Sequence, residues 1–214
     1  MMKRAMVLAM VLLSGEALAQ TRNGPRQFVE VRHAAVNRLL RQPAATPQRD
    51  AQVARILNGL LDLDELAQRA LDPFWAQRTP AERQEFITLL RQLIERNYQQ
   101  NLRQTADFAV AYEPETINES AGTAVVRSTA RSRTDARAAP VTLEYRLIRR
   151  NNAWLVYDVV TNNSSLLQTY HDSYTRIIRT QGFPALLTRM RSRVAAIQNG
   201  TAVTASPTGP SPAP

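Results

Sequence analysis

The sequence has little of the chemistry that most catalytic and metal sites use. Its 214 residues include no cysteine, seven glycines and two histidines, His33 and His171. Without cysteine, disulfides, thiolate metal sites and a lipid-modified N-terminal cysteine are excluded. The two histidines stand on separate predicted helices, so no paired metal ligand is expected. The scattered glycines also provide no Gly-rich loop that would cradle a phosphate.

The remaining nucleophiles do not indicate a catalytic triad. Ser165, His171 and Asp158 supply the residue types, but Ser165 lacks the Gly-x-Ser-x-Gly context of a nucleophile elbow. Asp62 and Glu65 belong to an acidic cluster at a predicted helix start, where carboxylates interact favourably with the helix dipole. We therefore expect neither an enzyme nor a resident cofactor or metal.

The N-terminus has the parts of a secretory signal peptide. Lys3 and Arg4 precede an apolar run over residues 5–13, and Ala17 and Ala19 place small residues where a signal peptidase reads the chain. A membrane span needs about 20 apolar residues, and this run is about half as long. We predict that residues 1–19 are cleaved and that the mature chain is exported to the periplasm.

The mature chain is expected to form one domain with a disordered tail. Residues 198–214 are rich in Pro, Ser, Thr, Gly and Ala, and Val203 is their largest aliphatic side chain. Such a segment cannot bury enough surface to offset the entropy lost on ordering. Residues 20–197 have the length of a single compact domain and show no internal repeat.

Arginine makes the chain strongly basic. Lysine and arginine number 27 against 18 acidic residues, a formal charge of +9, and Lys3 is the single lysine. Such a charge suits nucleic acid, anionic lipid or an acidic protein. Because export is predicted and no RNA-binding aromatic run is present, we expect lipid or protein partners and no nucleic acid. Arg131, Arg133, Arg146 and Arg149, on or beside predicted strands, are candidates for headgroup or partner docking, with simple solvation as the alternative.

Hydrophobic periodicity predicts helices in the first half of the domain. Apolar residues recur at three- and four-residue spacing over residues 26–41, from Pro47 onward, over 62–71 and over 80–104. Thr46 and Asp62 are predicted N-caps, and Thr79 with Glu82 is predicted to form a capping box. The buried stripe of the first helix is expected to contain Phe28, Val31 or Arg32, Ala35, Val36, Leu39 and Leu40.

The period then changes to alternation, which predicts strands over residues 108–112, 123–133, 140–148 and 153–160. Asn151 and Asn152 form the turn of a hairpin. Two helices follow, over 166–180 and 184–197, with Gly182 capping the first and Pro184 opening the second. This order predicts an α+β fold in which helices pack on one apolar face of a curved antiparallel sheet. The pattern leaves open whether the core is filled or encloses a cavity.

Three separated blocks carry a family resemblance. They are FWAQRTPAERQEFITLLRQLIERNY over residues 74–98, WLVYDVV over 154–160, and the helical stretch from Ser165. In this order they resemble the MlaC family, the periplasmic phospholipid carriers of the Mla lipid-asymmetry system, also called the toluene-tolerance auxiliary family of an ABC transporter. Asn163 stands where the family usually has Gly, a replacement that tolerates a left-handed backbone. His171 replaces the usual Arg, which puts a partner or headgroup contact there in question.

The resemblance implies an NTF2-like mixed fold with a helical subdomain and a cavity for the acyl chains of a phospholipid. It further implies a carrier, expected to be a monomer, that moves lipid between an inner-membrane Mla-type ABC transporter complex and an outer-membrane lipoprotein–porin complex. The alternative is an exported adaptor with a filled core and no lipid. The expected cavity wall, taken from the predicted helix and strand faces, is Phe74, Trp75, Phe86, Leu90, Val141, Leu143, Tyr145, Leu147, Leu155, Tyr157, Val159, Leu166, Tyr170, Tyr174 and Ile177.

Overall fold

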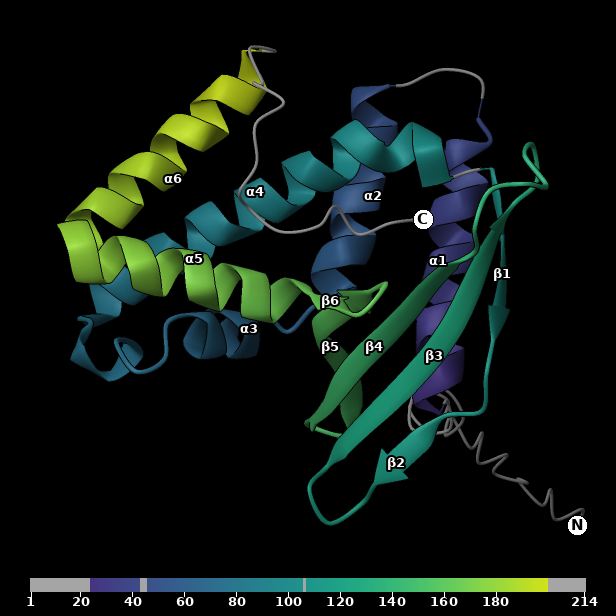
Figure 1. The fold of residues 1–214 in the computed structure, drawn as a ribbon, viewed down its shortest axis with the longest axis horizontal. Coiled ribbons are helices and arrows are strands. Elements are labelled where there is room, and N and C mark those ends of the chain that lie inside the picture. The colour runs from purple at the N-terminus through teal and green to yellow at the C-terminus, as the bar shows by residue number, and fades with distance from the viewer. Residues whose placement is uncertain (1–23, 43–45, 106, 200–214) are drawn as a thin grey trace, which may run out of the picture.

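A computed structural model describes residues 24–42, 46–105 and 107–199 of the chain. The predicted signal peptide and residues 200–214 of the predicted tail lie outside the described residues. A group of helices lies beside a twisted antiparallel sheet, and α1 runs along the sheet (Figure 1). None of the helices in the described ranges is long and apolar enough to cross a bilayer.

The helices are α1 (Pro25–Leu40), α2 (Pro47–Leu60), α3 (Leu63–Ala70), α4 (Pro80–Thr105), α5 (Leu166–Gln181) and α6 (Phe183–Gln198), with a short 3₁₀ helix, η1 (Trp75–Gln77). The strands are β1 (Phe108–Tyr112), β2 (Thr116–Asn118), β3 (Thr123–Ser132), β4 (Val141–Arg150), β5 (Ala153–Thr161) and β6 (Ser164–Ser165). The sheet order is β1-β3-β4-β5-β6, and β2 also pairs with β3. The predicted α+β class is confirmed, while the two shortest strands, β2 and β6, were not predicted.

The predicted helix starts are confirmed by their hydrogen bonds. Thr46 Oγ1 accepts from Arg49 N at 3.1 Å, and Asp62 Oδ1 accepts from Glu65 N at 3.0 Å. At the start of α4, Thr79 Oγ1 accepts from the backbone N–H of Glu82, and the Glu82 carboxylate accepts from Thr79 N at 2.8 Å. Each cap satisfies N–H groups that a helix leaves unpaired.

Left-handed residues form the turns that the sequence predicts. Asn151 and Asn152, with φ of 47° and 62°, form the two-residue turn between β4 and β5. Asn163 has φ of 67°, so the left-handed backbone that its side chain tolerates does occur. Gly182 has φ of 82° and ends α5, as predicted.

The apolar side chains form three clusters. One lies on the inner face of the sheet with α1, a second joins α3, α4, α5 and α6, and a small third one joins α1 to α2 through Val36, Val53 and Leu57. Of the two alternatives in the stripe predicted for the first helix, Arg32 is the partly buried one, and Val31 is 53% exposed. Val29, only 2% exposed, is buried instead, because the sheet meets α1 on that side.

A β-bulge changes which residues of β5 face the core. Arg146 pairs with Asp158 and Leu147 pairs with Val156, so Tyr157 is the extra residue. Trp154 and Val156 are buried before the bulge, and Val159 is buried after it. The predicted single alternating face through Leu155, Tyr157 and Val159 was therefore wrong, because the bulge shifts the alternation by one residue.

Asp158 ties the sheet to the start of α5. Its carboxylate, 1% exposed as a residue, accepts from Ser165 Oγ at 2.8 Å, from Leu167 N at 3.0 Å and from Arg146 Nη1 at 3.2 Å. Ser165 Oγ in turn accepts from Gln168 N at 3.0 Å and caps the helix. Ser165 and Asp158 therefore serve the join between β5 and α5.

We expect Asp158→Asn to lower the free energy of unfolding by about 2–4 kcal/mol. The amide N–H₂ of asparagine would face groups that already donate hydrogen bonds to this position, and the negative charge that pairs with Arg146 would be lost. Urea denaturation at neutral pH measures the change. The control is Glu119→Gln, which removes a surface ion pair with Arg149 and should change stability by less than about 0.5 kcal/mol. Equal, small losses in both variants would contradict the role given to Asp158.

Candidate functional site

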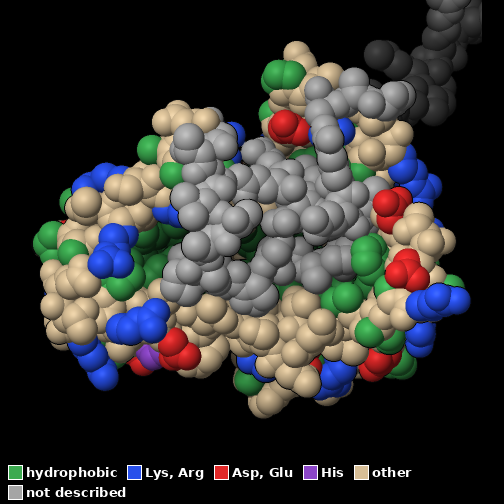
Figure 2. Space-filling model, turned by 45° about the horizontal axis from the view of Figure 1, so that its top comes forward, with side chains coloured by type: hydrophobic (Ala, Val, Ile, Leu, Met, Phe, Trp, Pro, Cys, Tyr) green, Lys and Arg blue, Asp and Glu red, His purple; other side chains and the backbone are tan. Residues whose placement is uncertain are grey.

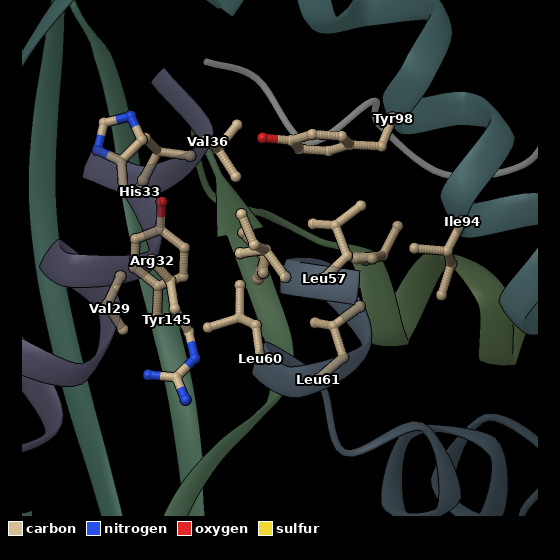
Figure 3. A pocket seen from close by; sticks show the side chains of 14 residues that line it. Val29, Arg32, His33, Val36, Leu57, Leu60, Leu61, Ile94, Tyr98 and Tyr145 are labelled. Carbon is tan, nitrogen blue, oxygen red and sulfur yellow. The ribbon is translucent and has the colours of Figure 1, made fainter. Parts of the chain in front are cut away.

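An apolar cavity lies between the inner face of the sheet and the helices α1, α2 and α4 (Figure 3). Its volume is about 90 Å³. The sheet contributes three residues, α1 and α2 contribute most of the remainder, and two residues of α4 and the first residue of α5 complete the wall. The lining residues are Val29, Arg32, His33, Val36, Ile56, Leu57, Leu60, Leu61, Ile94, Tyr98, Leu143, Tyr145, Val159 and Leu166.

Helix and strand periods explain why these residues meet. Val29, Arg32 or His33, and Val36 recur at three- and four-residue spacing and therefore share one face of α1. Ile94 and Tyr98 are likewise one turn apart on α4. On the sheet, Leu143 and Tyr145 point to the same face because they are two residues apart in β4. The cavity is thus formed by the regular faces of neighbouring elements.

One end of the cavity carries tyrosine hydroxyls. The Tyr98 hydroxyl points across the cavity from α4, and the Tyr145 hydroxyl points along β4 toward His33 (Figure 3). Burial raises the pKa of Tyr145 to about 12, and burial also raises the pKa of Tyr98. Both phenols are therefore neutral at physiological pH and are able to donate hydrogen bonds.

His33 connects this end to the sheet. Its Nδ1 lies 2.8 Å from the Tyr112 hydroxyl, and its Nε2 lies 3.0 Å from Asn37 Nδ2. Burial lowers the pKa of His33 below its ordinary value. The imidazole is therefore held neutral inside a hydrogen-bonded chain that joins α1 to β1.

Arg32 is the charged residue of the cavity wall. Its guanidinium lies 3.5 Å from the centroid of the Phe28 ring, and Nη1 donates to Phe28 O at 3.1 Å. Burial lowers the pKa of Arg32 from its usual high value. The cation is thus held by a ring face and a carbonyl of its own helix.

Four of the sequence-predicted wall residues lie on this cavity: Leu143, Tyr145, Val159 and Leu166. Leu147 belongs to the cluster on the inner face of the sheet, and the partly buried side chains of Val141 and Leu155 pack against that cluster. Tyr157 lies away from it, with the guanidinium of Arg69 4.5 Å from its ring centroid.

The other predicted wall residues are on the helical side of the molecule. The rings of Tyr170 and Tyr174 stack with centroids 5.4 Å apart, and Phe86 meets Tyr174 edge-on at 5.5 Å. Leu90 is buried in the same cluster, and the partly buried side chains of Trp75 and Ile177 pack against it. Phe74 is half-buried just before η1. The stripe of α5 thus mainly covers α3, α4 and α6, and the cavity takes only its first residue.

The predicted docking arginines are spread over the molecule. Arg146 pairs with Glu144 at 3.0 Å and with Asp158, and Arg149 pairs with Glu119 at 2.9 Å. Arg131 and Arg133 are exposed near the end of β3. In Figure 2, basic side chains occur at the left, on the side of α5 and α6, and at the right, with acidic ones among them.

The sequence did not identify the residues that α1 and α2 bring to the cavity. The spacing of Ile56, Leu57 and Leu60 indicated an amphipathic helix, but it carried no sign that this face borders a space. His33 gave no metal signal, and within the described ranges no cluster of His, Asp or Glu suits a metal ion. The apolar stripes of the helices were the available signal for buried faces. Which faces pack against one another could be determined only from the structure.

The fold and the cavity define an α+β protein whose helices enclose an apolar space against a curved sheet. The family model described as MlaC protein matches residues 30–192, and the chain belongs to this family. A similar solved structure is that of the phospholipid-binding protein from Ralstonia solanacearum in complex with a phospholipid. It has a TM-score of 0.73 and 24% sequence identity, over 82% of this chain and 99% of that chain. Among curated proteins, no significant match was found.

We expect the neutral state of His33 to make stability depend on pH. The folded-state pKa of His33 is lowered, so the unfolded chain binds a proton more readily, and the free energy of unfolding falls as the pH drops below about 6.5. His33→Gln removes this contribution, so the variant should lose less stability than the parent between pH 7 and pH 5.5. Urea denaturation at both pH values tests this, and identical losses in the two proteins would contradict it.

Proposed function

We propose that this protein is a soluble periplasmic phospholipid carrier that holds acyl chains in the apolar cavity under α1 and α2. The cavity carries the proposal, because its wall is mostly aliphatic and aromatic in a chain of the MlaC family. The complex of the similar R. solanacearum protein with a phospholipid supports the choice of ligand. Leu143, Tyr145, Val159 and Leu166 are the proposed lipid contacts among the residues predicted from the sequence.

The energetics of lipid transfer explain why a cavity is sufficient. Two acyl chains carry on the order of 30 methylenes, and at about 0.8 kcal/mol each their exposure to water costs roughly 25 kcal/mol. An apolar cavity replaces that water contact, so the carrier needs no bond chemistry. The proposal therefore includes no catalytic step and no cofactor beyond the lipid itself.

The cavity must widen when a lipid enters. Its volume of about 90 Å³ has room for about three water molecules, far less than two acyl chains require. The small cluster of Val36, Val53 and Leu57 joins α1 to α2, whereas α3, α4, α5 and α6 share a larger core. Movement of α1 and α2 together away from the sheet enlarges the space and keeps both the α1–α2 cluster and the larger helical core intact, while it exposes Phe28 and Val29 of α1.

Transfer between membranes also requires docking. The family resemblance points to an inner-membrane Mla-type ABC transporter complex and an outer-membrane lipoprotein–porin complex. Arg131 and Arg149 are proposed contacts for acidic faces of such partners, because long cationic side chains at the surface steer association. Binding that weakens steeply with added salt would support electrostatic docking.

We expect the mature protein, purified from a bacterial periplasm under gentle conditions, to carry one phospholipid. Native mass spectrometry followed by lipid extraction measures this occupancy. Leu60→Trp places a larger side chain against the cavity and should lower occupancy by roughly fivefold or more, at a cost in stability of about 1–3 kcal/mol.

The matched control is Val31→Trp, which adds the same side chain to an exposed position of α1. This variant should retain the occupancy of the parent protein, and circular dichroism should show both variants folded. A lipid-free mass in every preparation, together with no uptake from phospholipid vesicles, would refute the carrier and favour the adaptor with a filled core.

A further inference from the structure

A second hollow adjoins the apolar cavity on the other side of His33. It is a groove of about 400 Å³ between α1 and β1. His33 lines both spaces, so they meet at this residue. The groove is lined by Glu30, His33, Ala34, Asn37, Arg38, Arg41, Phe108, Val110, Tyr112 and Arg133.

The groove carries uncompensated positive charge. Arg38, Arg41 and Arg133 line it, and no carboxylate of the described residues lies within ion-pair distance of their side chains. Glu30 is the acidic residue of the lining, and it already accepts from Arg26 Nε at 2.8 Å. Elsewhere on the surface, Arg69, Arg127 and Arg149 each lie beside a carboxylate that offsets their charge.

The hydrogen-bond chain at His33 leaves two polar groups unused. With Asn37 Nδ2 donating to Nε2, the neutral ring carries its proton on Nδ1 and donates it to the Tyr112 oxygen. The Tyr112 hydroxyl hydrogen then remains available to a ligand oxygen. Asn37 Oδ1 is buried and accepts no hydrogen bond in the structure.

Building on the proposed function, we infer that this groove binds the phosphate of the lipid whose acyl chains occupy the cavity. The guanidinium groups of Arg38, Arg41 and Arg133 match a phosphate in charge and hydrogen-bonding geometry. The Tyr112 hydroxyl donates to a phosphate or ester oxygen. Arg32 has a different role, because its guanidinium is already held by the ring and the carbonyl of Phe28.

The site orients the ligand. When the phosphate lies in the groove, the glycerol region of the lipid lies beside His33 and the tyrosine hydroxyls. The acyl chains then extend toward Leu57, Leu60 and Leu143. The protein should therefore discriminate a phospholipid from a diacylglycerol with identical chains, which fits the cavity equally well and lacks the phosphate.

Competition between these two lipids tests the inference. The full mature chain is incubated with vesicles that contain equal amounts of dioleoylphosphatidylglycerol and dioleoylglycerol, and the bound lipids are counted by native mass spectrometry. The wild-type protein should prefer the phospholipid by about tenfold or more, as expected for several charge-assisted contacts. The double variant Arg38→Gln/Arg133→Gln should reduce this preference by about fivefold or more while it still binds dioleoylglycerol.

Arg91→Gln is the matched control, because Arg91 is exposed on α4 and outside the groove. It should keep the full preference. An unchanged preference in the double variant, or no preference in the wild-type protein, would overturn the phosphate site and leave the carrier function intact. Uptake of neither lipid by the wild-type protein would instead refute the proposed function itself.

Inorganic phosphate distinguishes the lipid headgroup from a free anion. Calorimetric titration of lipid-free protein with phosphate should give no saturable binding, and millimolar phosphate should leave the bound phospholipid in place. Tight phosphate binding that the double variant abolishes would overturn the assignment to lipid and make the groove a site for free anions.

Discussion

The inner face of the sheet must be covered, and the rest of the structure follows from that requirement. β3, β4 and β5 direct Val126, Leu147 and Val156 to one face, and all three are fully buried. A sheet of this kind twists, and the bulge at Tyr157 bends it further. Straight helices therefore cannot contact the curved face along its whole length. α1 and α2 cover most of the face, and the remaining mismatch is the apolar cavity. The space for a ligand is thus a geometric result of packing straight helices on a curved surface.

Local features of the fold were predictable because short-range chemistry determines them. The caps at Thr46 and Thr79 depend on side chains three residues apart, and the turn at Asn151 depends on a left-handed conformation that asparagine tolerates. β2 escaped prediction because three residues give no measurable alternation. The bulge in β5 also escaped, because Tyr157 follows the alternation of its neighbours in sequence and leaves it only through pairing with β4.

The candidate site was less predictable than the fold, since it depends on which apolar faces meet. Tyr170 and Tyr174 have the same helical spacing as residues that line a cavity, yet their rings stack inside the helical core. Leu57 and Leu60 have an ordinary amphipathic spacing and nevertheless border the cavity. Composition cannot separate these cases, because the distinction is made by long-range contacts. Arg38 and Arg41 were equally indistinct among many arginines, and only the fold brings them together with Arg133 along the α1–β1 groove.

The junction between α2 and α3 has a consequence for association between copies of the chain. Asp62 N donates to Val156 O at 2.8 Å, Leu61 forms a parallel bridge to Val156, and Arg150 Nε donates to Asp62 at 3.1 Å. These contacts cover β5 at Val156, on the side away from β4, where β6 pairs only with Val160 and Thr161. A second molecule that tried to extend the sheet there would have to displace a buried peptide hydrogen bond and an ion pair. The chain thus blocks this edge of its sheet from templating intermolecular strand pairing, which protects it against aggregation.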